Sequence, residues 1–146
     1  MTWVRAFLLF TPGIISITSF AQKNIKLASP AGDIVFSFRL VNASPVYNVF
    51  YKQKPVIENS SLSLIYKENG EFKNNLAIGK LIFKNGTDDY NLLVGKTRHV
   101  YDQYKEVTIP LKEKKAPFRE IDFVVRVFND GLAFRYEYPT HDAREP

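Results

Sequence analysis

The chain has 146 residues, which is enough for one domain of ordinary size and too few for two. Hydrophobic residues make up 45% and charged residues 24%, a balance typical of a globular protein rather than a disordered one. The net charge is +5, no block of five or six like charges occurs, and there is no cysteine. The composition therefore does not indicate a nucleic-acid-binding arm, a disulfide framework or a cysteine-based metal or redox site.

The first 21 residues have the pattern of a secretory leader. Arg5 gives a positively charged start, residues 6–20 are largely apolar, and Ser19 and Ala21 are small residues just before Gln22. We predict a signal peptide over residues 1–21, cleaved between Ala21 and Gln22, and hence an exported protein, periplasmic or secreted. The alternative is a membrane anchor, but the apolar run is short for a span and is interrupted at residues 11–13. Cleavage removes Arg5 and no acidic residue, which leaves 19 basic against 15 acidic residues and a net charge of +4.

Short strands separated by turns are predicted for the first half of the remaining chain. Apolar residues alternate with polar ones over residues 24–27, 34–40 and 46–51. Residues rich in Pro, Gly, Asn and Ser or Lys predict turns at 29–32, 42–45 and 52–55. Residues 56–57 and 62–64 suggest two further short strands before a polar stretch at 67–71.

The middle of the chain has a weaker pattern. We expect one strand over residues 76–83, ended by Asn85-Gly86, a favoured hairpin dipeptide. A short apolar run follows at residues 92–94. Residues 107–111 alternate cleanly, and Pro110 places this strand at a sheet edge or a bulge because proline cannot donate to the ladder. Residues 112–117 are expected to form a solvated loop.

A β-hairpin near the C-terminus is the strongest structural signal. Apolar residues alternate onto one face over 121–127 and again over 132–138. Asn129, Asp130 and Gly131 supply the structural turn, because these residue types tolerate positive φ. If Gly131 holds a positive φ, Gly131→Val should destabilise the fold by ~1–3 kcal/mol.

These elements predict an all-β fold, an antiparallel β-sandwich, with essentially no helix in the mature chain. No window of a dozen residues repeats apolar positions at helical spacing. The predicted organisation is a signal peptide at 1–21, a β-sandwich domain at 22–139 and a polar tail at 140–146.

No residue of this chain is assigned a catalytic, cofactor-binding or metal-binding role. His99 and His141 lie far apart, and surface exposure is the preferred interpretation of His99. Asp88 and Asp89 lack the ligand density of a calcium loop, so a charge pair at a hairpin end is preferred.

Acidic residues at alternate strand positions are the other candidates, because glycoside hydrolysis uses two carboxylates. Glu120 and Asp122 share a face, as do Arg135 and Glu137, and the latter two are interpreted as a surface ion pair. The tyrosines and phenylalanines fall mostly at alternating strand positions, so core packing is preferred over a sugar-binding platform.

Three segments in order resemble glycoside hydrolase family 97. Residues 126–139, R-V-F-N-D-G-L-A-F-R-Y-E-Y-P, look like the family's "R-v-y-N-D-G-x-A-F-R-Y-x-x-P" segment. Residues 27–34 are similar to its opening "S-P-x-G" strand pair, and residues 47–57 resemble its next strand and turn. The resemblance covers nearly the whole mature chain.

The resemblance implies the N-terminal, galactose-mutarotase-like β-supersandwich of an exported, calcium-dependent α-glucosidase or α-galactosidase. In that family the catalytic carboxylates belong to a (β/α)₈ barrel, and a later part of the N-terminal domain supplies a glutamate to the calcium. This chain ends about halfway through such a domain, so no catalytic or metal residue is carried over. The expected partners are the barrel and, through the intact enzyme, α-glycosides.

Three hypotheses follow from that ending. The first is a fragment of a family 97 glycosidase that performs no chemistry by itself. The second is a freestanding exported β-sandwich that binds carbohydrate or a partner protein. The third is a nonfunctional remnant.

Overall fold

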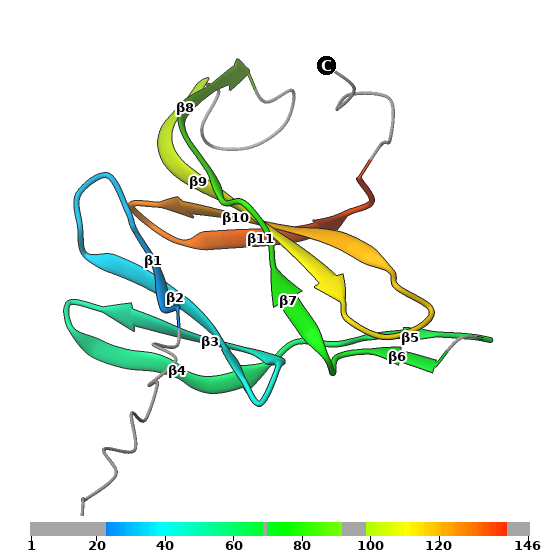
Figure 1. Cartoon of the computed structure of the whole chain (residues 1–146). Coiled ribbons are helices and arrows are strands. Elements are labelled where there is room, and N and C mark those ends of the chain that lie inside the picture. The colour runs from blue at the N-terminus through cyan, green and yellow to red at the C-terminus, as the bar shows by residue number, and fades with distance from the viewer. Residues whose placement is uncertain (1–22, 69, 92–98, 140–146) are drawn as a thin grey trace, which may run out of the picture.

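The computed structural model describes residues 23–68, 70–91 and 99–139, which form eleven strands and contain no helix (Figure 1). Accordingly, no helix suited to crossing a membrane is found within these ranges. The strands are β1 (Ile25–Ala28), β2 (Ile34–Val41), β3 (Ser44–Tyr51), β4 (Lys54–Ser61), β5 (Leu64–Tyr66), β6 (Gly70–Phe72), β7 (Leu76–Ile78), β8 (Ile82–Asn91), β9 (His99–Glu113), β10 (Glu120–Phe128) and β11 (Leu132–Glu137).

Two antiparallel sheets face each other, which confirms the predicted all-β sandwich. The first sheet has the order β1-β2-β3-β4. The second has the order β11-β10-β9, and β7 and β8 share the other edge of β9. β5 and β6 form a separate two-stranded sheet beside them. Figure 1 shows the two larger sheets as layers, with β10 and β11 above β2 and β3.

The core lies between the two sheets and uses the residues whose alternation predicted the strands. Phe36 and Phe38 of β2 meet Phe123 of β10, with ring centroids 6.3 and 5.7 Å apart, and all three are fully buried. The predicted inward faces are confirmed on β1, β2, β9 and β10, because hydrophobic residues at these alternate positions bury their side chains. The buried members are Ile25, Leu27, Ile34, Phe36, Phe38, Val107, Ile109, Leu111, Ile121, Phe123, Val125 and Val127.

The β2–β3 and β3–β4 turns lie where they were predicted but are shorter. Asn42 and Ala43 have φ of 51° and 59°, and Lys52 and Gln53 have φ of 48° and 66°. Positive φ at two consecutive residues is the geometry of a tight hairpin turn. The following pairs Ser44-Pro45 and Lys54-Pro55, which we had assigned to the turns, begin β3 and β4 instead.

The prediction of a single strand over residues 76–83 is wrong. β7 ends at Ile78, the chain crosses over at residues 79–81, and β8 then runs from Ile82 straight through Asn85-Gly86 to Asn91. The expected turn at Asn85-Gly86 is therefore also wrong. A Cβ on Gly86 would lie 2.4 Å from the ring of Tyr104, so glycine makes room there for a cross-strand aromatic ring.

Pro110 lies inside the second sheet rather than at its edge. Its carbonyl accepts a hydrogen bond from the Gly79 N–H at 2.8 Å, where β9 changes partner from β7 to β8. Between the last β7 pair and the first β8 pair, residues 79–81 of the crossover lie opposite residues 109–110 of β9. The expected edge position is wrong, but the expected irregularity is present, because the ladder is interrupted where proline lacks an N–H.

The predicted C-terminal hairpin is confirmed as β10 and β11, with Val125 opposite Phe134 and Val127 opposite Leu132. The positive φ that we expected at its turn is not found: none of Asn129, Asp130 and Gly131 has one. A Cβ on Gly131 would meet nothing within 4 Å, so the predicted strain of Gly131→Val loses its basis. Asn129 instead links the two sheets, because its Oδ1 accepts a hydrogen bond from the Ala31 N–H at 2.8 Å.

Four sequence predictions lie outside the described residues. They are the signal peptide at 1–21 with its cleavage site at Ala21 and Gln22, the apolar run at 92–94, the tail at 140–146, and His141 within that tail.

Candidate functional site

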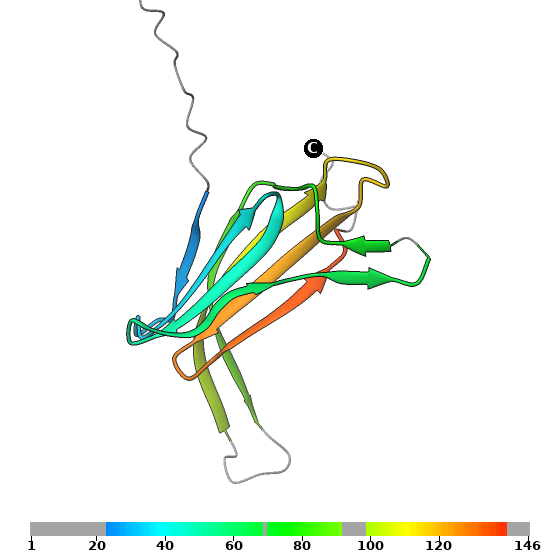
Figure 2. The ribbon, with the colours of Figure 1, turned by 90° about the horizontal axis from the view of Figure 1, so that it is seen from below.

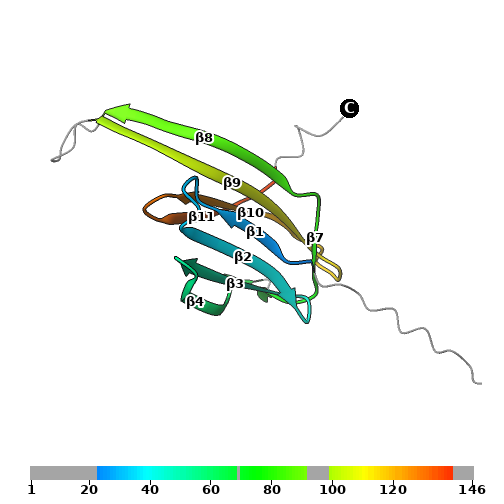
Figure 3. The ribbon, with the colours of Figure 1, turned by 90° about the vertical axis from the view of Figure 1, so that its left-hand side faces the viewer.

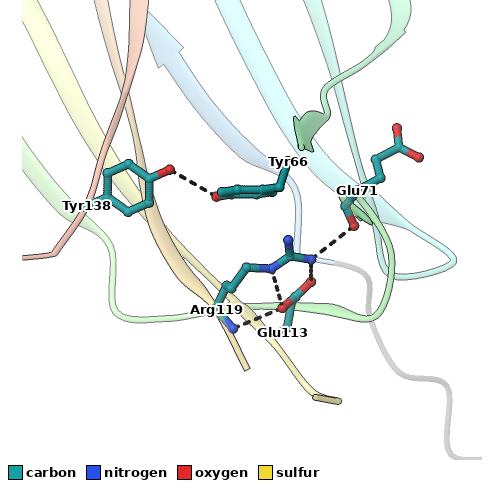
Figure 4. Close-up of polar contacts among 5 residues, drawn as sticks. All are labelled: Tyr66, Glu71, Glu113, Arg119 and Tyr138. Carbon is teal, nitrogen blue, oxygen red and sulfur yellow. Dashed lines mark hydrogen bonds and ion pairs between the residues drawn. The ribbon is translucent and has the colours of Figure 1, made fainter. Parts of the chain in front are cut away.

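A buried ion pair joins the ends of the β9–β10 hairpin (Figure 4). Two parallel bonds connect Arg119 and Glu113: Nη2 to Oε1 at 2.5 Å and Nε to Oε2 at 2.9 Å. The Arg119 backbone N–H also donates to Glu113 Oε2 at 3.0 Å, and Nη2 donates to the Glu71 carbonyl of β6 at 3.2 Å. The side chains are 17% and 7% exposed. Arg119 therefore fastens the β5–β6 hairpin to the second sheet.

Two tyrosines complete this cluster. The Arg119 guanidinium carbon lies 4.5 Å from the centroid of the Tyr66 ring, a cation–π distance. The Tyr138 hydroxyl, just beyond β11, donates to the Tyr66 hydroxyl at 3.2 Å. Figure 4 shows the flat Tyr66 ring between these two partners. The cluster thus gathers residues from β5, β6, β9, the β9–β10 loop and the end of β11.

The electrostatics of this cluster favour a clamp rather than a reactive centre. Hydrogen bonds from Arg119 lower the pKa of Glu113 against the opposing effect of burial, and the same pairing raises the pKa of Arg119. Burial, with the hydrogen bond to Tyr138, raises the pKa of Tyr66 to about 12. At neutral pH the carboxylate is charged and fully paired, while the phenol is protonated. Neither group is suited to act as a base or a nucleophile.

A second charged cluster lies on the outer face of the second sheet. Glu106 of β9, only 5% exposed, accepts from Arg126 Nε of β10 at 2.6 Å, and Arg135 Nη1 lies 3.8 Å away. Arg126 also stacks over the Tyr104 ring at 4.2 Å. The hydrogen bond to Glu106 raises the pKa of Arg126. The predicted ion pair of Arg135 and Glu137 is confirmed at 2.5 Å.

The other candidates from the sequence lie apart from these clusters. His99 is exposed, as expected, and its Nε2 lies 2.7 Å from Asp89 Oδ1 near the end of the β8–β9 hairpin. Asp88 lies 3.7 Å from Arg126, so the two neighbouring aspartates bind different partners. Glu120 pairs with Lys112 at 2.5 Å. Within the described residues, no three His, Cys, Asp or Glu side chains gather as metal ligands would.

Sequence reasoning missed both ion pairs in which a buried glutamate meets an arginine. Glu113 lies within residues 112–117, which are predicted to form a solvated loop, whereas the structure makes it the last residue of β9. Arg119 lies just beyond that segment, and six residues of separation across a loop give no periodic signal. Glu106 and Arg126 are direct cross-strand partners, so the register of β9 against β10 would have revealed them. That register depends on the length of the connecting loop, and the loop length could not be predicted from the sequence alone.

Comparison with solved structures finds enzymes that share this fold. A glycoside hydrolase family 97 enzyme from Pseudoalteromonas sp. strain K8, in complex with panose, matches with a TM-score of 0.73 and 27% identity. The match covers 82% of this chain and 18% of that chain, and the complex with acarbose gives the same values. A β-arabinopyranosidase matches with a TM-score of 0.70 and 23% identity, over 80% of this chain and 18% of that chain, which shows likeness of fold alone.

The family comparison gives the same result from the sequence. Residues 27–145 match the family described as Glycosyl-hydrolase 97 N-terminal, in agreement with the resemblance of the three segments. The chain spans 18% of the length of the solved enzymes it matches. The chain therefore belongs to glycoside hydrolase family 97, in the region of the family's N-terminal domain.

Proposed function

We propose that this chain is the leading part of the non-catalytic N-terminal domain of an exported, calcium-dependent α-glycoside hydrolase. In this proposal a catalytic barrel outside the chain performs the hydrolysis and the intact enzyme binds the calcium. The domain contributes by packing against the remainder of the enzyme and by supporting carbohydrate binding.

The family match over residues 27–145 is the observation on which this proposal rests. The Pseudoalteromonas enzyme that shares the fold at 27% identity was solved with panose and with acarbose. An oligosaccharide substrate for the intact protein is the simplest inference from this kinship.

The state of the buried carboxylates supports a non-catalytic role. Glycoside hydrolysis uses two carboxyl groups on either side of the scissile bond, with space for the sugar between them. Glu106 and Glu113 instead point at arginine guanidinium groups, in bonds of 2.5 to 2.9 Å. A carboxylate held this way contributes to the fold and is not available to protonate or attack a glycosidic bond.

An open side of the sandwich supports packing against further protein. β4 and β11 are edge strands, and inward-facing Phe134 is 44% exposed between them. Beside the β10–β11 turn lies a groove of about 600 Å³, lined by residues that include Tyr51 of β3, Val56 of β4 and Leu132 of β11. Exposed apolar surface next to unpaired strand edges is typical of a face that another element covers. We assign this side to the continuation of the domain in the intact enzyme.

The experiment that tests the proposal is a mass measurement on the exported fraction of the source organism, with an antibody raised against the mature N-terminus. We expect a species larger than this chain by at least a barrel of ~250 residues. The purified species should hydrolyse an α-glucoside or α-galactoside and lose that activity when calcium is chelated. A species the size of residues 22–146, without hydrolase activity, would overturn the proposal.

A freestanding carbohydrate- or protein-binding sandwich is the second candidate. The observation that favours it is a single core with fully buried residues from both sheets, which is enough to hold a sandwich of this size together. The mass measurement separates the two candidates directly.

A further inference from the structure

The β8–β9 hairpin extends beyond the sandwich as a two-stranded ribbon. β10 pairs with β9 only from Tyr104 onward, so residues 99–103 of β9 pair only with residues 87–91 of β8. Figures 2 and 3 show this part of the ribbon projecting past the other strands. We call residues 87–91 and 99–103 the arm.

One face of the arm carries one tyrosine ring among hydrogen-bonding side chains. The register pairs Asp89 with Tyr101, Thr87 with Gln103 and Asn91 with His99, which places all six on one face. All six are exposed, and Tyr101 is 63% exposed. None is aliphatic.

This face continues the inner face of the second sheet, yet its composition differs from that of a core. Nearer to the sandwich on the same face, Phe83 lies opposite Val107. This is an apolar pair suited to contact with another sheet. On the arm the corresponding positions are polar apart from the Tyr101 ring. A surface that an apolar sheet was meant to cover would repeat the apolar pair. The arm face is therefore built for water or for a hydroxylated ligand.

The carboxylate beside the ring is oriented by a neighbouring side chain. Asp89 lies directly across from Tyr101, where cross-strand Cβ atoms are about 5 Å apart. Its Oδ1 lies 2.7 Å from His99 Nε2, which orients the carboxylate while the other oxygen stays available. Next along the ribbon, Thr87 and Gln103 border a groove of about 300 Å³ whose other walls include Pro30 and Lys105. This volume is at the lower end of small-ligand sites.

From this arrangement we infer that the arm binds a pyranose-containing oligosaccharide. The flat C–H face of one sugar ring stacks on Tyr101, because aromatic rings present a large apolar surface with a polar tip. Asp89 accepts hydrogen bonds from its hydroxyls, and the neighbouring sugar unit enters the groove beside Thr87 and Gln103. The inference rests on the proposed function, which supplies the reason for oligosaccharides to be present.

The test is a titration of the full, ¹⁵N-labelled chain with maltotriose, followed by amide NMR shifts. We expect saturable shifts at residues 87–91 and 99–105 and at Pro30's neighbours. Tyr101→Ala should weaken the apparent affinity about tenfold, the equivalent of losing one stacked ring, and Tyr101→Phe should retain it. Tyr90→Ala is the matched control: Tyr90 is 50% exposed on the same ribbon but on the opposite face, so affinity should stay within about twofold.

Gln103→Ala provides a second variant that keeps the ring and should weaken binding at the groove. Absence of shifts on the arm at saturating sugar, or equal losses for Tyr90→Ala and Tyr101→Ala, would overturn the inference. Shifts confined to β11 and β4 would also overturn it, since they would place the sugar on the open side. None of these outcomes alters the mass and hydrolase measurements, so failure of the subsite is distinguishable from failure of the proposed function.

Discussion

The second sheet contains two long hairpins, β8–β9 and β10–β11, which are joined by the pairing of β9 with β10 but behave differently. The β10–β11 hairpin lies against the first sheet, and its inner face is fixed by Phe123, which contacts four aromatic rings at 5.3 to 6.3 Å. The β8–β9 hairpin leaves the sandwich and ends in the exposed arm. Both hairpins contain Asn and Gly in a pattern typical of turns. Only Asn129-Asp130-Gly131 forms a turn, while Asn85-Gly86 lies inside a strand. Cross-strand neighbours, and not the dipeptide alone, decide where the chain reverses.

The largest expected effect is in the core-anchored hairpin. Phe123→Ala removes a fully buried ring from between the two sheets and should lower the free energy of unfolding by about 3–5 kcal/mol, because the site is packed on every side. Urea unfolding monitored by fluorescence of the tyrosines measures the change. Phe83→Ala is the matched control on β8, where the ring is 56% exposed, and should cost less than about 1 kcal/mol. Equal losses for both variants would contradict the contrast between the hairpins.

The next effect concerns the Arg119 clamp that closes the β9–β10 hairpin. Glu113→Gln removes the negative charge that accepts the two hydrogen bonds from the Arg119 guanidinium in Figure 4 and should cost about 1–3 kcal/mol at neutral pH. Glu137→Gln, which removes an exposed ion pair with Arg135, should cost about 0.5 kcal/mol or less.

This effect depends on pH with a definite sign. The folded-state pKa of Glu113 is lowered, so its contribution is fully present above the unfolded pKa of about 4.3 and is lost as the pH falls through the folded value. The stability difference between the native chain and Glu113→Gln should therefore be constant above about pH 5 and shrink in more acidic buffers. A difference that grows on acidification would refute the assignment of the pair as a stabilising contact.

The ribbon should be sensitive at Gly86. Gly86→Val would bring side-chain atoms into the Tyr104 ring and displace it from its stack with Arg126, at a cost of about 1–2 kcal/mol. The cost should largely disappear when Tyr104 is already alanine, so a double-mutant cycle in urea isolates the contact. If the two changes in the free energy of unfolding simply add, the position of the Tyr104 ring does not depend on glycine at residue 86.

Alternation was enough to predict the sandwich, because each of the four best-patterned strands buries the expected face. Ile34, Phe36 and Phe38 illustrate this, as do the residues of β10. Alternation reports only which side of a strand faces the core, and that depends on residues two apart. It therefore succeeded without any knowledge of pairing.

Features that depend on pairing were not predictable in the same way. The break at Gly79, the strand through Gly86 and the central place of Pro110 all depend on which strand lies beside β9. The ion pair of Glu106 with Arg126 depends on strand register, and that of Glu113 with Arg119 depends on loop closure. Neither was therefore predicted from the sequence. Lys52 and Gln53 show the converse case, since they adopt positive φ without glycine because the flanking strands β3 and β4 require a tight turn.

The smallest expected effect is at the turn that the sequence identified most strongly. Gly131 has no positive φ and faces open space, so Gly131→Ala should leave the free energy of unfolding within about 0.5 kcal/mol of the native value or raise it slightly. Asn129→Ala should cost more, about 1 kcal/mol, because it removes the acceptor for the Ala31 N–H that links the two sheets. Paired thermal melts of the two variants measure the difference. A larger loss for Gly131→Ala would mean that the hairpin depends on its glycine after all, whereas the expected order places its stability in the core contacts and the inter-sheet bond.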